Sequence, residues 1–269
     1  MLQQFRGAMP KALALAAMVL CCPATDAAPT APLVIDVEDA AAPWSQADGS
    51  GAANEIVQTA FAHAGRKILL RVVPYARCKA ELLAGSVVGC VAVGGDEAMG
   101  RQVRLPKTPL YRVTTVLVSF RKVDSCDAAA WQGATIGRVN GYEYAPRFEQ
   151  LVRQPHIDVS VALSETLALR MLAAGRMDAV ALQLDPLKTL DFVVRDAGLA
   201  SPPRVACELG PLDSHIGFSL QHPDGARALA DFERGHAAAM ADGSVARILS
   251  RWRERLLEQT APEKNDKPR

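Results

Sequence analysis

The sequence predicts an α/β fold with a largely parallel sheet. Short apolar runs of strand length alternate with segments of helical periodicity, and glycines such as Gly65, Gly85 and Gly175 end the helical segments. The same strand–helix–strand order occurs twice, around residues 67–93 and 157–182, which is typical of two α/β lobes. The length of 269 residues suits one large domain or two small ones.

The first part of the chain shows alternating strands and helices, followed by a further strand. Within its first helical segment, Ile56, Val57, Ala60 and Phe61 fall on one face, as expected of a helix that covers a sheet. The expected elements, in chain order, are a strand at 32–37, a helix at 53–65, a strand at 67–73, a helix at 75–85, and strands at 89–93 and 114–120.

The second repeat follows the same pattern. Ser164 has N-cap spacing to the helix that follows it, and Gly175 ends that helix. The expected elements are a strand and glycine turn at 131–144, a helix at 145–152, a strand at 157–163, a helix at 164–175, a strand at 177–182, and two closing helices at 225–243 and 244–259.

The N-terminal segment reads as a secretory signal peptide. Arg6 and Lys11 precede an apolar stretch of 11 residues, and small residues follow it. That stretch is too short to span a bilayer, and cleavage is expected after Ala27. A lipid anchor at Cys21 or Cys22 is the alternative, although Leu20 is a poor match to the small residue that such an anchor needs.

The mature chain is expected to be exported and electrically neutral. Of the 30 basic and 29 acidic residues, residues 1–27 hold Arg6, Lys11 and Asp26, so the remainder carries 28 of each. No basic stripe is present, which argues against nucleic-acid binding. Four cysteines remain, Cys78, Cys90, Cys126 and Cys207, and they allow three disulfide pairings.

No metal or other cofactor is expected. No two cysteines are spaced as Cys-x-x-Cys, and the five histidines form no cluster with ligand spacing. The Gly-x-Ser-x-Gly and Gly-x-Gly-x-x-Gly motifs of hydrolases and dinucleotide-binding proteins are also absent from the sequence.

Residues 90–105, CVAVGGDEAMGRQVRL, have the features of a ligand-binding loop. A short buried strand ends at Gly94 and Gly95, and loops at the carboxyl ends of parallel strands face the crevice in which α/β proteins bind ligands. The glycines let the backbone approach a ligand closely, and Arg101 can form two parallel bonds to a carboxylate. The alternative is a simple turn followed by a surface arginine.

Four stretches, in this order, resemble the periplasmic solute-binding proteins of ABC importers, in particular the polar amino acid family. They are LVIDVEDAAAPWS, CVAVGGDEAMGR, MLAAGRMDAVAL and ADGSVARILSRW. The resemblance covers about residues 32–256. It implies a two-lobed periplasmic binding protein fold of type II, in which two crossover strands join the lobes of a clamshell.

The resemblance also implies the domain organisation. The signal peptide covers residues 1–27, the first lobe covers 28–120 and 207–258, the second lobe covers 121–206, and a disordered tail covers 259–269. Hinges are expected near 119–122 and 205–208. Because the two crossovers run side by side in this fold, Cys126 and Cys207 are expected to form a disulfide; Cys78 with Cys90 is a less certain pair.

In the first lobe, the resemblance places Gly94, Asp96 and Arg101 against a ligand carboxylate. Asp96 would either orient Arg101 or repel an anionic ligand. Trp44 corresponds to an aromatic ring over the ligand, and Glu38 to a residue that grips a basic side chain. For each, the alternative is an ordinary structural role.

Tyr75 and Arg77 lie at the start of the helix at 75–85 and correspond to residues near the cleft. In the second lobe, Gly141 and Tyr142 correspond to a loop that presents backbone N–H groups to a carboxylate, with tyrosine in place of a small hydroxyl residue. Gln183 stands where the family usually has an aspartate for the ligand's ammonium group, so the usual amino-acid site is incomplete.

The predicted function is capture of a small polar solute, an amino acid or related carboxylate, for an ABC importer. The expected partners are that solute and a permease in the inner membrane, and the protein is expected to be a periplasmic monomer rather than an enzyme. One alternative is a periplasmic dehydratase on the same scaffold, with a general acid from among Glu38, Asp96, Glu143 and Asp185. Another is a stand-alone solute sensor or helper protein.

Overall fold

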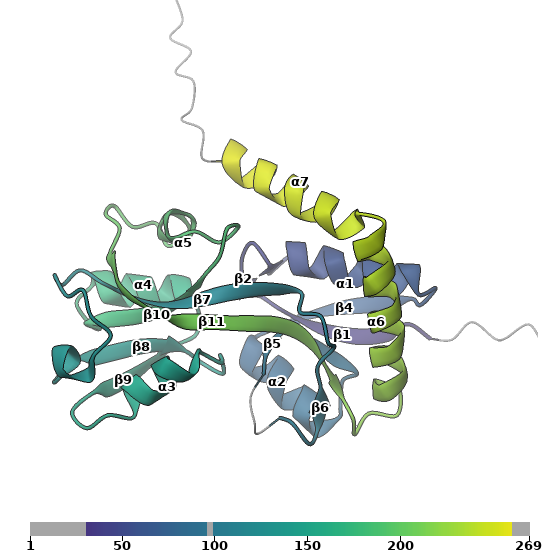
Figure 1. The fold of residues 1–269 in the computed structure, drawn as a ribbon, viewed down its shortest axis with the longest axis horizontal. Helices are drawn as coiled ribbons and strands as arrows, with labels where there is room; N and C mark the ends of the chain where they lie inside the picture. Colours follow the sequence, from purple (N-terminus) through teal and green to yellow (C-terminus); the bar gives the residue numbers. More distant parts are fainter. Residues whose placement is uncertain (1–30, 96–98, 260–269) are drawn as a thin grey trace, which may run out of the picture. The chain divides into compact units, whose positions relative to one another are not determined.

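The computed structural model describes residues 31–95 and 99–259. The signal peptide, its cleavage after Ala27, Asp96 and most of the expected tail lie outside these ranges. Within them, one nine-stranded sheet has the order β4-β1-β5-β11-β7-β10-β8-β9, with β6 paired to β11 (Figure 1). The mixed α/β fold expected from the alternating pattern is therefore present.

The first half-sheet consists of β1, β4, β5 and β6. Helices α1, α2, α6 and α7 lie with it in Figure 1. Its elements are β1 (Leu33–Glu38), α1 (Ala52–His63), β4 (Ile68–Val73), α2 (Tyr75–Ala84), β5 (Gly89–Gly94), β6 (Val103–Arg104), α6 (Gly225–Ala241) and α7 (Ser244–Glu258). A separate small ribbon pairs β2 (Ala40–Ala41) with β3 (Ser45–Gln46).

The second half-sheet consists of β8, β9 and β10. Its elements are η1 (Ala128–Trp131), β8 (Thr135–Val139), α3 (Pro146–Val152), β9 (Asp158–Ala162), α4 (Glu165–Ala173), β10 (Ala179–Leu184) and α5 (Leu190–Asp196). The Ser164 hydroxyl accepts a hydrogen bond from the backbone N–H of Leu167, so it caps α4 as the sequence predicts.

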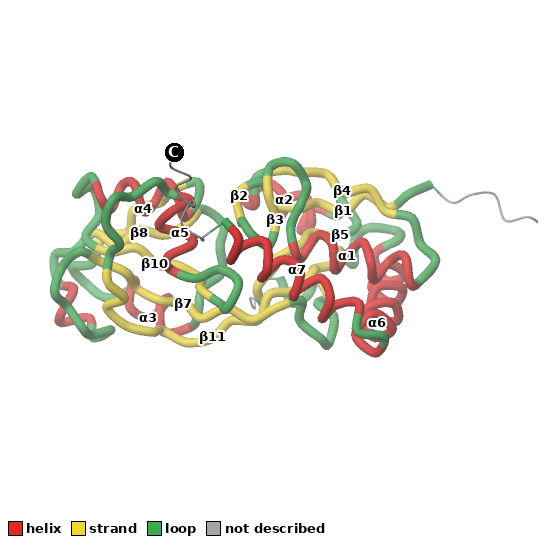
Figure 2. The backbone as a smooth tube through the Cα atoms, turned by 90° about the horizontal axis from the view of Figure 1, so that it is seen from above, coloured by secondary structure: helices red, strands yellow, loops and turns green. Residues whose placement is uncertain are grey.

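Two long antiparallel strands join the half-sheets. They are β7 (Tyr111–Ser119) and β11 (Arg204–Ser219), paired from Tyr111 opposite Ser214 to Ser119 opposite Arg204. Figure 2 shows β11 running beside β7 between the two groups of helices. The outer strands of each half-sheet are parallel, as expected, whereas the centre is antiparallel because the chain crosses once in each direction.

The register shows where the chain crosses. β10 pairs with Thr114–Val118 of β7, and β5 pairs with Ser214–Phe218 of β11. The strand expected at 114–120 is thus hydrogen-bonded to the second half-sheet. Between these pairings, Arg112 lies opposite Asp213 and donates two hydrogen bonds, of 2.6 and 2.9 Å, to its carboxylate.

Helix α1 packs unusually closely against α6. A Cβ at Gly235 would lie 1.8 Å from the carbonyl oxygen of Ala60, so only glycine lets the two helices approach this far. Phe61, Phe218 and Phe232 meet at this contact, with ring centroids 5.8 to 6.3 Å apart, and all three are fully buried. This core holds α1 and α6 against the first half-sheet.

The sequence pattern missed most of β11. Gly210 and Pro211 interrupt the apolar pattern of β11, and such residues normally end a strand. Here a register shift between Glu208 and Gly210 absorbs the irregularity, and pairing with β7 continues on both sides. Tertiary pairing therefore extends a strand that local propensity would stop.

Two disulfides are present. Cys126 is joined to Cys207, with Cα atoms 5.6 Å apart, as predicted from the side-by-side crossovers. Cys78 of α2 is joined to Cys90 of β5 at 5.7 Å, which confirms the less certain pair. Among residues 31–95 and 99–259, no helix is long and apolar enough to cross a bilayer. In the same ranges, no group of three or more His, Cys, Asp or Glu side chains could hold a metal ion.

The Cys126–Cys207 bond should contribute strongly to stability. It closes a loop of 81 residues, so its removal by a Cys126→Ser, Cys207→Ser double substitution should lower the free energy of unfolding by about 4 kcal/mol. Both positions are partly exposed, so the hydroxyl group of a serine placed there can reach water. Urea denaturation under oxidising conditions measures the loss. In a reductant that opens both bonds, wild type and variant should unfold at nearly the same urea concentration; equal stability under oxidising conditions would contradict the prediction.

Candidate functional site

A cavity of about 20 Å³ lies where the carboxyl ends of strands from both half-sheets meet. This volume holds about one water molecule, so the site is closed as it stands. Its lining comes from both half-sheets and from the crossing strands: Glu38, Ala41, Tyr75, Ala92, Gly94, Tyr111, Val113, Tyr142, Glu143, Gln183, Leu212 and Ser214. A crevice at strand carboxyl ends is where α/β proteins bind ligands.

The strand beneath the cavity is strained at Ala92. This residue has φ of 70°, a left-handed conformation that alanine rarely adopts. It lies at an irregularity of the β5–β11 pairing, where Val93 is opposite His215 and Val91 is opposite Ile216. The unpaired Ala92 faces the cavity. Strain of this kind persists where the surrounding structure enforces it and is concentrated at binding sites.

Glu38 ends β1 at the cavity and is 2% exposed. The pKa of its carboxyl group is raised from 4.5 to about 8, chiefly by burial, with smaller contributions from the nearby Glu165 and Asp39 carboxylates. A hydrogen bond of 2.5 Å from the Tyr142 hydroxyl and the positive charge of Lys188 act in the opposite direction. The carboxyl group of Glu38 is therefore mostly protonated at pH 7.

A buried ion pair supports the opposite wall. Lys188 pairs with Glu165, and their side chains are 5% and 3% exposed. Glu165 also accepts a hydrogen bond of 2.8 Å from the backbone N–H of Gln183, a cavity residue. Because each buried charge has a close partner, this pair positions β10 at the cavity without leaving an uncompensated charge.

Trp44 packs behind the cavity rather than lining it. Its ring stacks on Tyr111, with centroids 3.8 Å apart and planes 5° apart, and Tyr111 faces the cavity. The indole N–H donates a hydrogen bond of 2.7 Å to Asp185, which lies beyond the end of β10. Trp44 therefore links the loop after β1 to the second half-sheet and supports the ring that the cavity uses.

Tyr75, Tyr142 and Gln183, three of the residues expected to bind the ligand, line the cavity. The Tyr75 and Tyr142 rings meet edge to face, with centroids 5.1 Å apart. Burial raises the pKa of both hydroxyl groups well above the usual value, so both remain donors at neutral pH. The Gln183 side-chain amide donates a hydrogen bond of 2.6 Å to the backbone carbonyl of Glu143.

Gly141, also expected to bind the ligand, does not line this cavity and lies close to the start of α2. It has φ of 82°, and a Cβ there would lie 3.2 Å from the Cα of Ala76. The absence of a side chain lets the loop after β8 approach the start of α2 closely. That approach brings Tyr142 and Glu143 into the cavity.

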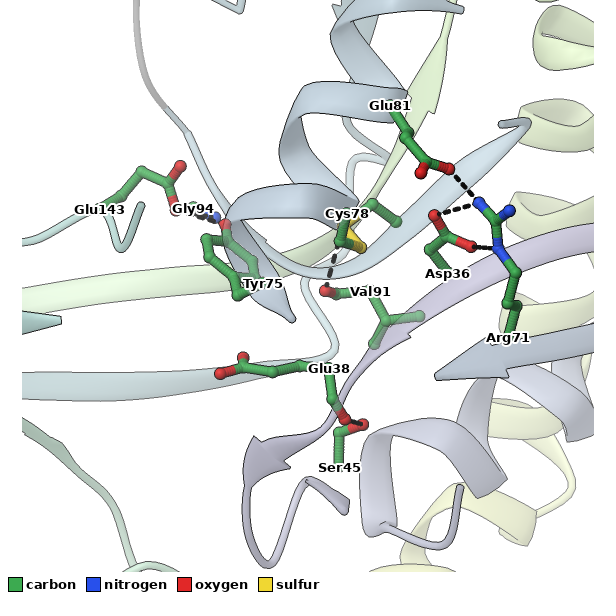
Figure 3. The surroundings of a disulfide bond; sticks show 11 residues. Asp36, Glu38, Ser45, Arg71, Tyr75, Cys78, Glu81, Val91, Gly94 and Glu143 are labelled. Atoms are coloured by element: carbon green, nitrogen blue, oxygen red, sulfur yellow. Dashed lines mark hydrogen bonds and ion pairs between the residues drawn. A yellow bond between two sulfur atoms is a disulfide. The ribbon is translucent and has the colours of Figure 1, made fainter. Parts of the chain in front are cut away.

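Two predicted arginines do not line the cavity. Arg77 is 62% exposed and pairs with Glu81, one turn further along α2, at 2.6 Å. Arg101 is exposed, and the residues around the cavity do not include it. Gly94 does line the cavity, but its backbone N–H points to Glu143 at 3.3 Å (Figure 3). The described structure thus places Gly94 at the cavity and does not bring Arg101 to it.

Sequence reasoning missed several cavity residues. Tyr111 and Ser214 lie on the crossing strands, and Glu143 was considered only as a possible general acid. Lys79, which binds Glu143 at 2.6 Å, lies one helical turn after Tyr75. The spacing of Tyr75 and Lys79 is a local signal that could have identified the two partners of Glu143, because residues i and i+4 share a helix face.

The protonated Glu38 should make stability depend on pH. Between pH 4.5 and 8 the folded protein retains a proton that the unfolded chain releases, so the free energy of unfolding falls as pH rises through this window. Glu38→Gln removes this dependence. The variant should match wild type near pH 5 and exceed it in stability at pH 8, as measured by urea denaturation across this range.

The control for this comparison is Glu258→Gln, which changes an exposed glutamate at the end of α7. It should follow the wild-type curve at every pH. Equal slopes with pH for wild type and Glu38→Gln would show that the Glu38 carboxyl group is not buried in solution.

Comparison with known proteins finds similarity in structure but none in sequence families. No protein-family model matches the sequence, and no curated protein matches it. Solved structures do match. A histidine kinase sensor domain described as similar to periplasmic binding proteins has a TM-score of 0.70 and 16% identity, over 82% of this chain and 96% of that one.

Amino-acid-binding proteins are also among these structures. An ancestral arginine-binding protein in complex with arginine has a TM-score of 0.69 and 15% identity, over 82% of this chain and 97% of that one. The arginine-, lysine-, histidine-binding protein ArtJ from Geobacillus stearothermophilus has a TM-score of 0.66 and 15% identity, over 82% and 94%. The chain therefore has the two-lobed fold of the periplasmic binding proteins, and its structural neighbours include those that bind amino acids, in agreement with the resemblance seen in its sequence.

Proposed function

We propose that this protein captures a small polar solute, such as an amino acid or a related compound, in the cavity between its lobes. The observation that carries the proposal is the composition of the cavity. It combines a backbone N–H at a strand end, three tyrosine rings and two carboxyl groups, contributed by both lobes. Small-molecule sites typically combine apolar walls with a few convergent polar groups in this way.

Two further features of the cavity support binding of a polar ligand. Ala92 holds a strained backbone there. In the described part of the chain, the hydroxyl group of Ser214 is buried at the cavity beside the Tyr111 hydroxyl, without a hydrogen bond of normal geometry. A buried polar group with a poorly aligned partner is costly, and a polar ligand would supply a better one.

Solute entry requires the lobes to separate, since the closed cavity holds about 20 Å³. We place the hinge near the start of β7 and within β11, around Arg112 and Asp213, because the pairing with β10 and β5 begins on either side of them. This replaces the hinge expected near 119–122 and 205–208. The first lobe then includes the chain before Arg112 and after Asp213.

The cellular role proposed is delivery of the solute to an ABC importer in the inner membrane, from the periplasm, by a monomeric protein. Two disulfides fit an oxidising compartment. A sensor role is the second candidate, because a histidine kinase sensor domain is among the structural neighbours. A permease that is stimulated by the purified protein would favour the importer role.

A thermal-shift screen of polar solutes tests the binding function. A ligand at 100 times its Kd stabilises the native state by about 2.7 kcal/mol, which for a chain of this size raises Tm by roughly 5–10 °C. The tryptophan fluorescence of the protein should change with the same ligand, because Trp44 bridges the lobes. Absence of any shift across amino acids, amines, organic acids and small sugars would reject the solute-binding function.

A further inference from the structure

The carboxylate of Glu143 is bound by a set of hydrogen-bond donors on the other lobe. One oxygen accepts hydrogen bonds from the Tyr75 hydroxyl at 2.6 Å and from the backbone N–H of Gly94 at 3.3 Å. The other oxygen accepts from the ammonium group of Lys79 at 2.6 Å. Figure 3 shows Glu143 directed at Gly94 and Tyr75 from across the cleft. Its side chain is 8% exposed.

These donors form a complete carboxylate site. A backbone N–H at a strand end, a hydroxyl group and an ammonium group are the charge-assisted partners that carboxylates prefer. Tyr75 and Lys79 lie in the first turns of α2, where the helix dipole favours negative charge. The protein therefore offers an anion site in the cleft and fills it with its own side chain.

The fit between Gly94 and Glu143 is close. A Cβ at residue 94 would lie 2.8 Å from the Cβ of Glu143, so any other residue would displace the loop. The loop itself is held in position by the Gln183 amide, which binds the Glu143 carbonyl at 2.6 Å. Glu143 is thus placed by its backbone as well as by its carboxylate.

A carboxylate ligand would be at a disadvantage in this cleft. It would compete with a tethered carboxylate, whose effective concentration is high because the closed lobes hold it against its donors. If it displaced Glu143, two negative charges would share one poorly solvated site, which is costly. A ligand without a carboxylate meets neither obstacle.

We propose that Glu143 is a built-in carboxylate that fills the anion subsite of the cleft, and that the ligand is therefore a small organic amine that lacks a carboxylate. This inference rests on the proposed solute-binding function and specifies its ligand class. The remaining polar lining is suited to a cation, since Glu38, Tyr111, Tyr142 and Ser214 present carboxyl and hydroxyl oxygens. Tyrosine rings also attract cations through their faces.

Matched pairs of ligands test the proposal directly on the mature protein. Agmatine and arginine, cadaverine and lysine, and histamine and histidine each differ by one carboxylate. Calorimetric titration of the wild type should give at least tenfold tighter binding for the amine in one or more pairs. Glu143→Gln keeps the shape of the side chain and removes its charge, so its preference should move by at least tenfold toward the amino acid of the same pair.

Glu149→Gln is the matched control. Glu149 lies on the adjoining helix α3, binds Arg138 at 3.0 Å and is not part of the cavity lining. This variant removes the same charge from the same lobe and should retain the wild-type preference. Circular dichroism and Tm report whether each variant is folded. The comparison of amine with amino acid on the wild-type protein tests the ligand class even if a variant fails to fold.

The outcomes separate the two proposals. A wild-type protein that binds the amino acids more tightly than the amines, or that binds other solutes in the broad screen but none of these amines, would overturn the ligand class and leave solute binding in place. An unchanged preference in folded Glu143→Gln would overturn the role of Glu143. A protein that binds nothing in either screen would overturn the solute-binding function itself.

Discussion

The antiparallel pairing of β7 with β11 is the constraint on which the rest of the structure depends. Each strand hydrogen-bonds to one lobe at one end and to the opposite crossing strand along its length. This pairing turns two parallel half-sheets into one continuous sheet and directs their carboxyl ends toward a common crevice. The Cys126–Cys207 bond lies near the first residues of β11 and restrains the chain there. The cavity exists because these crossings bring the ends of β1, β5 and β10 together.

The cleft is closed mainly by polar contacts between side chains of opposite lobes. Tyr142 binds Glu38, Trp44 binds Asp185, and Glu143 binds Tyr75, all at 2.5 to 2.7 Å. Polar contacts of this kind have a modest net free energy, because water can replace each partner when the lobes part. A closed state held by such contacts can open at a modest cost in free energy, which suits the proposed solute-binding role.

The electrostatics of the cleft follow from burial. Glu38 lies among apolar and hydroxyl groups and retains its proton, whereas Glu143 is matched by an ammonium group and backbone and hydroxyl donors. Glu165 and Lys188 neutralise each other. Three carboxyl groups within one site thus have different environments. A cationic ligand would alter this balance chiefly at Glu38, the buried carboxyl group at the cavity that retains its proton near neutral pH.

The sequence by itself determined the α/β class, the order of most helices and strands, and the fold family. These follow from local periodicity, from glycine positions such as Gly85 and Gly175, and from short motifs. The Cys126–Cys207 pair followed from the resemblance. The resemblance also pointed to Glu38, Tyr75, Gly94, Tyr142 and Gln183 as ligand residues, and these line the cavity.

Only the tertiary structure decided which side chains meet across the cleft. Arg101 follows the glycine loop in sequence, yet the Gly94 N–H binds Glu143, which is 49 residues away. Trp44 faces Asp185 from 141 residues away. Such contacts depend on the register of β7 with β11 and on the close approach that Gly141 allows, and neither leaves a local pattern in the chain. Strand pairing over long separations is set by the packing of the whole sheet, so the chemistry of the site became visible only once the lobes were in place.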